Sequence, residues 1–104
     1  MQHLNDIPVK ELFPGFNFKL VHGAQSTLSF VDIKKGSILP EHQHVHEQVT
    51  YVVEGQLDMI IGGEKYILTP GMTHVIPSST PHSAIAITDV KVMDFFSPAR
   101  DDYR

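Results

Sequence analysis

Short apolar runs separated by glycine, proline and polar turn residues are the dominant pattern of this sequence. The separating segments KKG, EG, GGE, TPG, PSSTP and TD are typical of turns, and the paired glycines of IGGEKY favour a two-residue hairpin turn. Many short strands within 104 residues predict a single all-β domain, either a sandwich or a barrel. One helical turn is expected at 8–13. We expect strands at residues 16–21, 27–34, 38–44, 49–54, 56–61, 65–68, 74–76, 83–88 and 90–96.

The composition excludes several classes of function. The eight lysines and arginines are scattered and the net charge is -4, whereas a nucleic-acid interface needs a basic face. No apolar run approaches the roughly 20 residues of a membrane span. There is no cysteine, and the first residues, MQHLNDIPVKELFPG, carry acidic groups and prolines where a signal peptide would be apolar. We therefore expect a cytoplasmic protein.

Seven histidines are many for this length, and their spacing predicts a metal site. In the segment HQHVHEQ, His42 and His44 alternate along a strand, so both imidazoles lie on one face with Cα atoms about 6 to 7 Å apart. Gln48 can reach the same ion if the chain turns, and His82 after PSSTP is the expected remote donor. His46 is the alternative to Gln48 as a ligand at that position. Nitrogen and oxygen donors suit Fe, Mn, Co, Ni, Cu or Zn, and affinity order does not choose among them.

The last strand directs a carboxylate toward apolar neighbours. In DVKVMDFF, Asp94 shares one face with Val90, Val92 and Phe96, and a buried carboxylate is expected to be paired, shifted in pKa or next to a wet cavity. A general acid or base beside a metal-bound substrate is one interpretation, with Arg100 holding a substrate carboxylate through its two-pronged fork. The other is that Asp94 pairs with Arg100 or a neighbour and that the tail is solvated.

Two motifs resemble those of the cupin superfamily. The first is Gly36, five residues, His42-x-His44, three residues, Gln48, six residues and Gly55. The second is Gly71, five residues, Pro77 and then His82. The pair spans residues 36–86, between an N-terminal arm at 1–15 and a C-terminal tail at 97–104. The resemblance implies a single cupin domain over 1–104, a double-stranded β-helix or jelly-roll barrel with a divalent transition metal in its lumen.

Three positions depart from the cupin pattern. Gln48 replaces the usual glutamate, Ser79 replaces a turn glycine, and Ala86 stands where asparagine is common. Only Gln48 bears on the chemistry, because the expected metal shell of His42, His44, Gln48 and His82 then carries no charge. A neutral shell favours the +2 state and Lewis-acid chemistry over activation of dioxygen.

The pattern Asp94-x-Phe96-x-x-x-Arg100, together with HEQ after His-x-His, resembles the KdgF-type cupins, which linearise unsaturated uronates. The resemblance implies that Asp94, Phe96 and Arg100 contact or transform a carboxylated sugar. A metal-dependent dioxygenase or other cupin enzyme on a small oxygenated metabolite, and a non-catalytic sugar-binding cupin, remain as alternatives. Apolar residues in MDFF and SAIAIT, on the face away from the metal, together with the pairing common among small cupins, favour a homodimer.

Overall fold

The computed structural model describes all 104 residues, and ten strands account for most of the chain. Two short 3-10 turns, η1 (Leu4–Asp6) and η2 (Asp101–Tyr103), flank the strands, and neither is long and apolar enough to cross a membrane. The strands are β1 (Lys10–Phe13), β2 (Phe16–His22), β3 (Thr27–Ile33), β4 (Ile38–His42), β5 (Glu47–Glu54), β6 (Leu57–Ile61), β7 (Glu64–Leu68), β8 (Thr73–Ile76), β9 (His82–Ala86) and β10 (Val90–Ser97).

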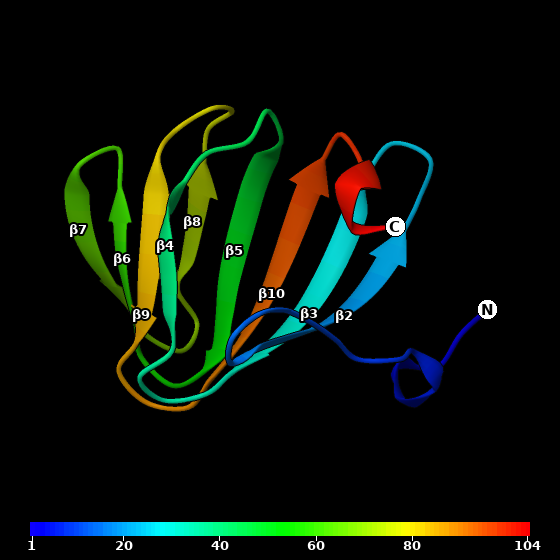
Figure 1. The fold of residues 1–104 in the computed structure, drawn as a ribbon, viewed down its shortest axis with the longest axis horizontal. Helices are drawn as coiled ribbons and strands as arrows, with labels where there is room; N and C mark the ends of the chain where they lie inside the picture. The colour runs from blue at the N-terminus through cyan, green and yellow to red at the C-terminus, as the bar shows by residue number, and fades with distance from the viewer.

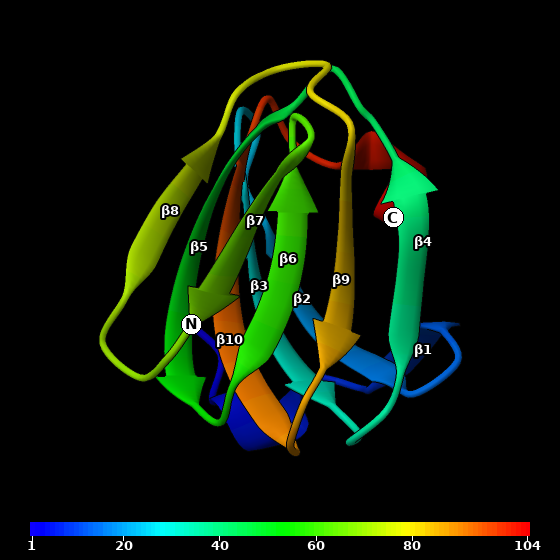
Figure 2. The same ribbon diagram turned by 90° about the vertical axis from the view of Figure 1, so that its left-hand side faces the viewer.

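The strands form two antiparallel sheets that enclose one lumen. The six-stranded sheet has the order β1-β2-β3-β10-β5-β8, and the four-stranded sheet has the order β4-β9-β6-β7 (Figure 1). The smaller sheet covers the larger one, as the turned view shows (Figure 2). Strands distant in sequence are neighbours, since β10 lies between β3 and β5, and β9 lies between β4 and β6. The all-β jelly-roll barrel predicted from the sequence is confirmed.

Alternation along the strands decides which side chains enter the lumen. On β10, Val90, Val92, Asp94 and Phe96 are buried, whereas Lys91 is exposed, as the sequence predicted. The 14 residues of the apolar core come from both sheets. They are Phe16, Phe18, Val31, Ile33, Val52, Leu57, Met59, Ile61, Leu68, Ile76, Ala84, Ala86, Val90 and Val92.

The predicted helical turn at 8–13 is wrong. Residues Lys10–Phe13 form β1 and pair with β2, and the 3-10 turn lies earlier, at Leu4–Asp6. Gly15 has a φ of 81°, which lets the chain reverse tightly after Phe13. The Phe13 ring then packs edge-on against Phe16 at 6.3 Å, and this pairing outweighs the local helical preference.

Candidate metal centre

Three imidazoles converge at one end of the barrel. His42 is the last residue of β4, His44 lies in the loop after it, and His82 is the first residue of β9. His42 and His82 are register partners on adjacent strands, with ring centroids 4.3 Å apart. One ring nitrogen from each histidine lies within 4.8 Å of the other two. The structure therefore brings together two donors from one segment and a third from a remote segment.

Hydrogen bonds to the main chain fix the tautomer of each ring. The Nδ1 atoms of His42, His44 and His82 lie 2.9, 2.9 and 2.8 Å from the carbonyl oxygens of Pro40, His46 and Thr80. A carbonyl oxygen only accepts, so each Nδ1 carries the proton and donates it. The Nε2 lone pairs are left free, which is the usual arrangement behind metal-binding histidines.

Lowered pKa values keep the rings of His44 and His82 neutral. Burial, assisted by the positive charge of Arg100, lowers the pKa of His44 to about 4. Burial likewise lowers the pKa of His82 below its ordinary value. Both imidazoles are therefore unprotonated at neutral pH and have their lone pairs available, as a metal ligand requires.

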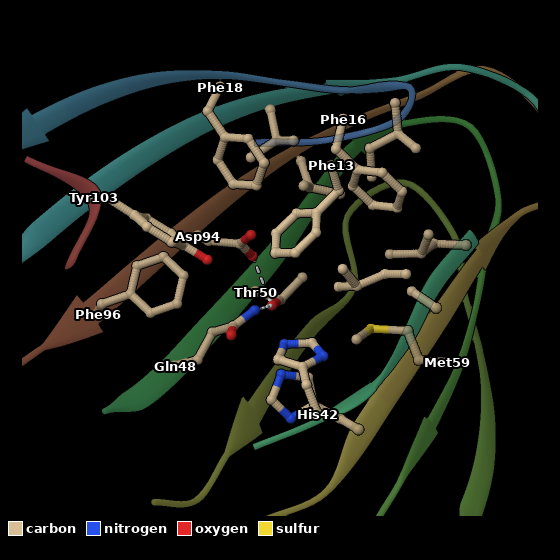
Figure 3. A pocket seen from close by; sticks show the side chains of 17 residues that line it. Phe13, Phe16, Phe18, His42, Gln48, Thr50, Met59, Asp94, Phe96 and Tyr103 are labelled. Carbon is tan, nitrogen blue, oxygen red and sulfur yellow. Dashed lines mark hydrogen bonds between the residues drawn. The ribbon is translucent and has the colours of Figure 1, made fainter. Parts of the chain in front are cut away.

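Gln48 is oriented by a chain of hydrogen bonds that ends on Asp94 (Figure 3). The Thr50 hydroxyl donates to Asp94 Oδ1 at 2.7 Å, so its oxygen accepts from Gln48 Nε2 at 3.0 Å. Gln48 Oε1 is thereby turned toward His44 and lies 3.2 Å from its Nε2. Two atoms bound to one cation at about 2.1 Å, at angles of 90° to 109°, are separated by about 3.0–3.4 Å.

This contact tests whether the residues suit a metal ion. Because the Nδ1 of His44 holds the ring proton, its Nε2 and Gln48 Oε1 are two acceptors facing each other, an arrangement that a shared cation stabilises. Three imidazole nitrogens and one amide oxygen are ordinary donors for a divalent transition metal. The residues fit such an ion, and the cluster indicates a metal site.

His46 lies beside this cluster rather than within it. Its ring is 5.4 Å from that of His44, and its Nδ1 is buried without a hydrogen-bond partner. The main-chain oxygen of His46 accepts the proton of His44 Nδ1. Of the two residues that compete for the fourth place, Gln48 is thus the one whose donor atom faces the cluster.

The PSSTP loop, which leads into His82, is hydrogen-bonded to the segment that carries His42 and His44. Ser79 has a φ of 57° and its N–H donates to the carbonyl oxygen of His44 at 2.7 Å, while Ser78 Oγ donates to that of Val45 at 2.6 Å. Ser79 thus keeps the left-handed conformation that favours glycine at such a turn. The sequence predicts the turn but not this contact, which depends on how the two loops approach each other in three dimensions.

Asp94 lies deeper in the same lumen and is 8% exposed. Burial raises its pKa to about 6, although the hydrogen bond from Thr50, the nearby Gln48 amide and the charge of Arg100 act in the opposite direction. Its register partners on the two neighbouring strands are Ser29 and Thr50. Thr50 was not singled out from the sequence, although its alternation with Gln48 places it on the same inward face.

Arg100 is buried at the same end of the barrel but does not pair with Asp94. Its guanidinium forms a bidentate ion pair with Asp102 and lies 4.7 Å from the Phe96 ring centroid. The alternative of a solvated tail is therefore wrong at Ala99 and Arg100, which are 5% and 4% exposed. Burial of these two residues was not visible in the sequence of the tail, which is mostly polar.

A cavity of about 40 Å³ lies between the candidate ligands and the apolar core (Figure 3). It is large enough for a few water-sized groups, so a sugar-sized ligand must lie largely in the mouth above it. The polar lining consists of His42, Gln48, Thr50, His82, Asp94 and Tyr103. The rest of the wall is apolar and includes Phe13, Phe16, Phe18, Leu39, Met59, Ala84 and Phe96.

A small antiparallel barrel with a histidine cluster in its lumen is the architecture of one large class of proteins, and the family model described as "Cupin domain" matches residues 29–96. The chain therefore belongs to the cupin superfamily.

Within that class, the chain is 30% identical over 102 residues to the pectin degradation protein KdgF of Dickeya dadantii, covering 95% of this chain and 93% of that protein. The solved structure of KdgF from Halomonas sp. is 35% identical and superposes with a TM-score of 0.89, covering 96% of this chain and 94% of that one. A shorter similarity, 41% over 51 residues, links 47% of this chain to 15% of quercetin 2,3-dioxygenase of Bacillus subtilis.

Proposed function

We propose that this chain is a metal-dependent enzyme of the isomerase type that opens and tautomerises 4,5-unsaturated uronates. One observation carries the proposal: a metal-donor cluster and a buried carboxyl group share one end of the lumen, and a buried guanidinium lies beside them, against the Phe96 and Tyr103 rings. Similarity over nearly the full length to a protein named for pectin degradation supports this class of substrate.

His42, His44, Gln48 and His82 are the proposed metal ligands. The set carries no charge, which suits a divalent ion, and Fe, Mn, Co, Ni, Cu and Zn all accept such donors. When bound, the ion supplies Lewis-acid stabilisation of negative charge that develops on a substrate oxygen. Thr50 contributes by holding the Gln48 amide so that its oxygen faces the cluster.

Asp94 is the proposed acid–base group. Linearisation moves the proton of the anomeric hydroxyl to the ring oxygen as the bond between that oxygen and the anomeric carbon breaks, which leaves an aldehyde and an enol. The enol then gains a proton on carbon and loses one from oxygen, so that the product is an isomer of the substrate. A carboxyl group with a pKa of about 6 both accepts and returns protons near neutral pH. Thr50 holds one oxygen of Asp94 in place during the transfer.

Arg100 and Phe96 are the proposed substrate contacts. A guanidinium recognises a carboxylate through two parallel hydrogen bonds, and Arg100 is the buried cation nearest to these groups. The Phe96 ring lines the cavity beside Asp94 and offers the sugar an apolar wall. The substrate is therefore proposed to be a small carboxylated sugar that lies in the mouth of the barrel.

A homodimer is proposed from the exposed apolar residues, and a cytoplasmic location from the composition. Phe95, Ile85 and Ile87 are 44%, 45% and 40% exposed on the outer faces of the sheets, where they can pair two copies of the chain as a homodimer. The lack of cysteine agrees with a cytoplasmic location.

The substitution Asp94→Asn tests the mechanism. It removes the proton carrier while keeping an oxygen that accepts from Thr50, so turnover of a 4,5-unsaturated uronate should be abolished. Metal content and metal affinity should stay near those of the wild type. Asp32→Asn, which changes an exposed carboxylate on the outer face of β3, is the matched control and should keep full turnover. Normal turnover of Asp94→Asn would remove Asp94 from the mechanism.

A dioxygenase is the second candidate, because about half of the chain is similar to quercetin 2,3-dioxygenase. Consumption of dioxygen by the Fe(II)-loaded protein in the presence of a small oxygenated substrate, without linearisation of unsaturated uronates, would favour it. The neutral donor set argues for the isomerase, since no anionic ligand compensates the extra charge of a +3 ion.

A further inference from the structure

The guanidinium of Arg100 is held on several sides in the protein. Its side chain is 5% exposed, and its Cζ lies 4.7 Å from the Phe96 ring centroid and 3.8 Å from that of Tyr103. The main chain is fixed as well, because Arg100 N–H donates to Thr27 Oγ1 at 2.9 Å. A long side chain that usually samples many rotamers is therefore ordered before any ligand arrives.

Asp102 occupies one edge of this guanidinium. Arg100 Nε donates to Asp102 Oδ1 at 3.0 Å, and Nη2 donates to Oδ2 at 2.8 Å. Asp102 binds only Nε and one N–H of Nη2, so it leaves the Nη1–Nη2 edge, whose fork geometry matches a second carboxylate. The Asp102 side chain is 53% exposed, although the guanidinium that it holds is almost fully buried.

We propose that Asp102 is a positioning residue that presents the free edge of Arg100 to the carboxylate of the substrate. Asp102 binds the Nε–Nη2 edge, the aromatic rings of Phe96 and Tyr103 restrict the guanidinium plane, and the only edge left is the one a ligand needs. This inference rests on the carboxylated ligand of the proposed function. It adds a residue that does not touch the substrate but acts through Arg100.

If Asp102 instead competed with the substrate for Arg100, its removal would change ligand affinity in the opposite direction. If its carboxylate occupied the site of the substrate carboxylate, removing it would free Arg100 and strengthen ligand binding. If it positions Arg100, removing it releases the guanidinium to other rotamers, and ligand binding weakens because the ordering must then occur on binding.

The test uses two sugars that differ in one group. Galacturonate carries the carboxylate but lacks the 4,5 double bond, so it binds without being linearised, and galactose lacks the carboxylate. Their dissociation constants are measured by calorimetry on Zn²⁺-loaded wild type, Asp102→Ala, Asp102→Asn and Asp101→Ala. Asp101→Ala is the matched control, since it removes an arginine partner one residue away, that of Arg104 at 2.7 Å.

Asp102→Ala should weaken galacturonate binding about 10-fold, with a smaller loss in Asp102→Asn, which keeps one acceptor. Galactose binding and Zn²⁺ affinity should not change, and Asp101→Ala should match the wild type. Equal or tighter binding of galacturonate by Asp102→Ala would overturn the proposal, as would a wild type that binds galacturonate no better than galactose. The expected pattern in a protein that fails to linearise unsaturated uronates would refute the isomerase and retain the role of Asp102.

Discussion

The two ends of the lumen are built from the same strands and differ in the side chains that those strands direct inward. At the closed end the inward side chains are apolar, and at the metal-bearing end they are polar. The change occurs within single strands: β3 passes from Ser29 to Val31, and β10 passes from Asp94 to Val92. The closed end is formed by Val31, Ile33, Val52, Leu57, Ala86, Val90 and Val92. The metal-bearing end is formed by Ser29, His42, His44, Gln48, Thr50, His82 and Asp94.

This difference shows that direction and polarity are separate properties of a strand. Direction follows from the two-residue period, which persists through Asp94 although its neighbours are apolar. Polarity then assigns a residue to the core or to the site. Because a shift of only two residues along the chain, about 6 to 7 Å, changes one role into the other, substitutions at the two ends should affect different measurements.

The largest effect is expected from His44→Ala at the metal-bearing end. Structural zinc sites bind with about 10–16 kcal/mol shared among four ligands, so one ligand contributes about 3–4 kcal/mol, or roughly 10²–10³-fold in metal affinity. The free energy of unfolding of the metal-free protein should change little, because the ring is neutral and only half-buried. Metal titration against a chelator, with urea unfolding in EDTA, measures both. Unchanged metal affinity would place the ion elsewhere.

Asp94→Asn should have the next largest effect, on the stability of the metal-free protein. The folded pKa of about 6 lies above the ordinary 3.8, so the folded state holds the proton more tightly than the unfolded state does. Stability therefore falls as pH rises from about 4 to 6, and above pH 6 ionised Asp94 costs about 2–3 kcal/mol. The variant should be more stable than the wild type by that amount at pH 7, with the difference vanishing near pH 4.

Urea unfolding in EDTA across this pH range checks the prediction for Asp94. A constant difference between variant and wild type at all pH values would mean that Asp94 does not titrate with a raised pKa. A less stable variant at pH 7 would mean that the carboxylate stabilises the fold through Thr50 rather than opposing it.

The smallest effect is expected from Ile33→Val at the closed end. Loss of one buried methylene from a residue 4% exposed should cost about 1 kcal/mol of unfolding free energy. Metal affinity of the folded protein should remain within about twofold of the wild type, since no donor is touched. A large loss of metal affinity in this variant, measured by the same titration, would show that the two ends are coupled. It would contradict the expectation that substitutions at the two ends affect different measurements.

Much of the fold could be predicted from the sequence, because alternation and turn residues are local signals. The common inward face of Val92, Asp94 and Phe96 followed from the two-residue period, and the structure confirms it. β1 could not be predicted, since Lys10–Phe13 is extended through pairing with β2 rather than through its own preference.

The candidate site was partly predictable for the same reason. Spacing alone placed His42 and His44 on one segment and suggested His82 as the remote donor. The hydrogen bond from Thr50 to Asp94 and the ion pair between Arg100 and Asp102 were missed, because each depends on how distant segments or the tail pack in three dimensions.

The pairing of His42 with His82 across β4 and β9 has a consequence for assembly of the barrel. A slip of either strand by one residue would turn one imidazole to the outer face, and a bound cation could then no longer bridge the two strands. Ion binding thus favours the correct register of β4 and β9 over shifted registers. In the metal-free chain, only the apolar side chains favour the correct register.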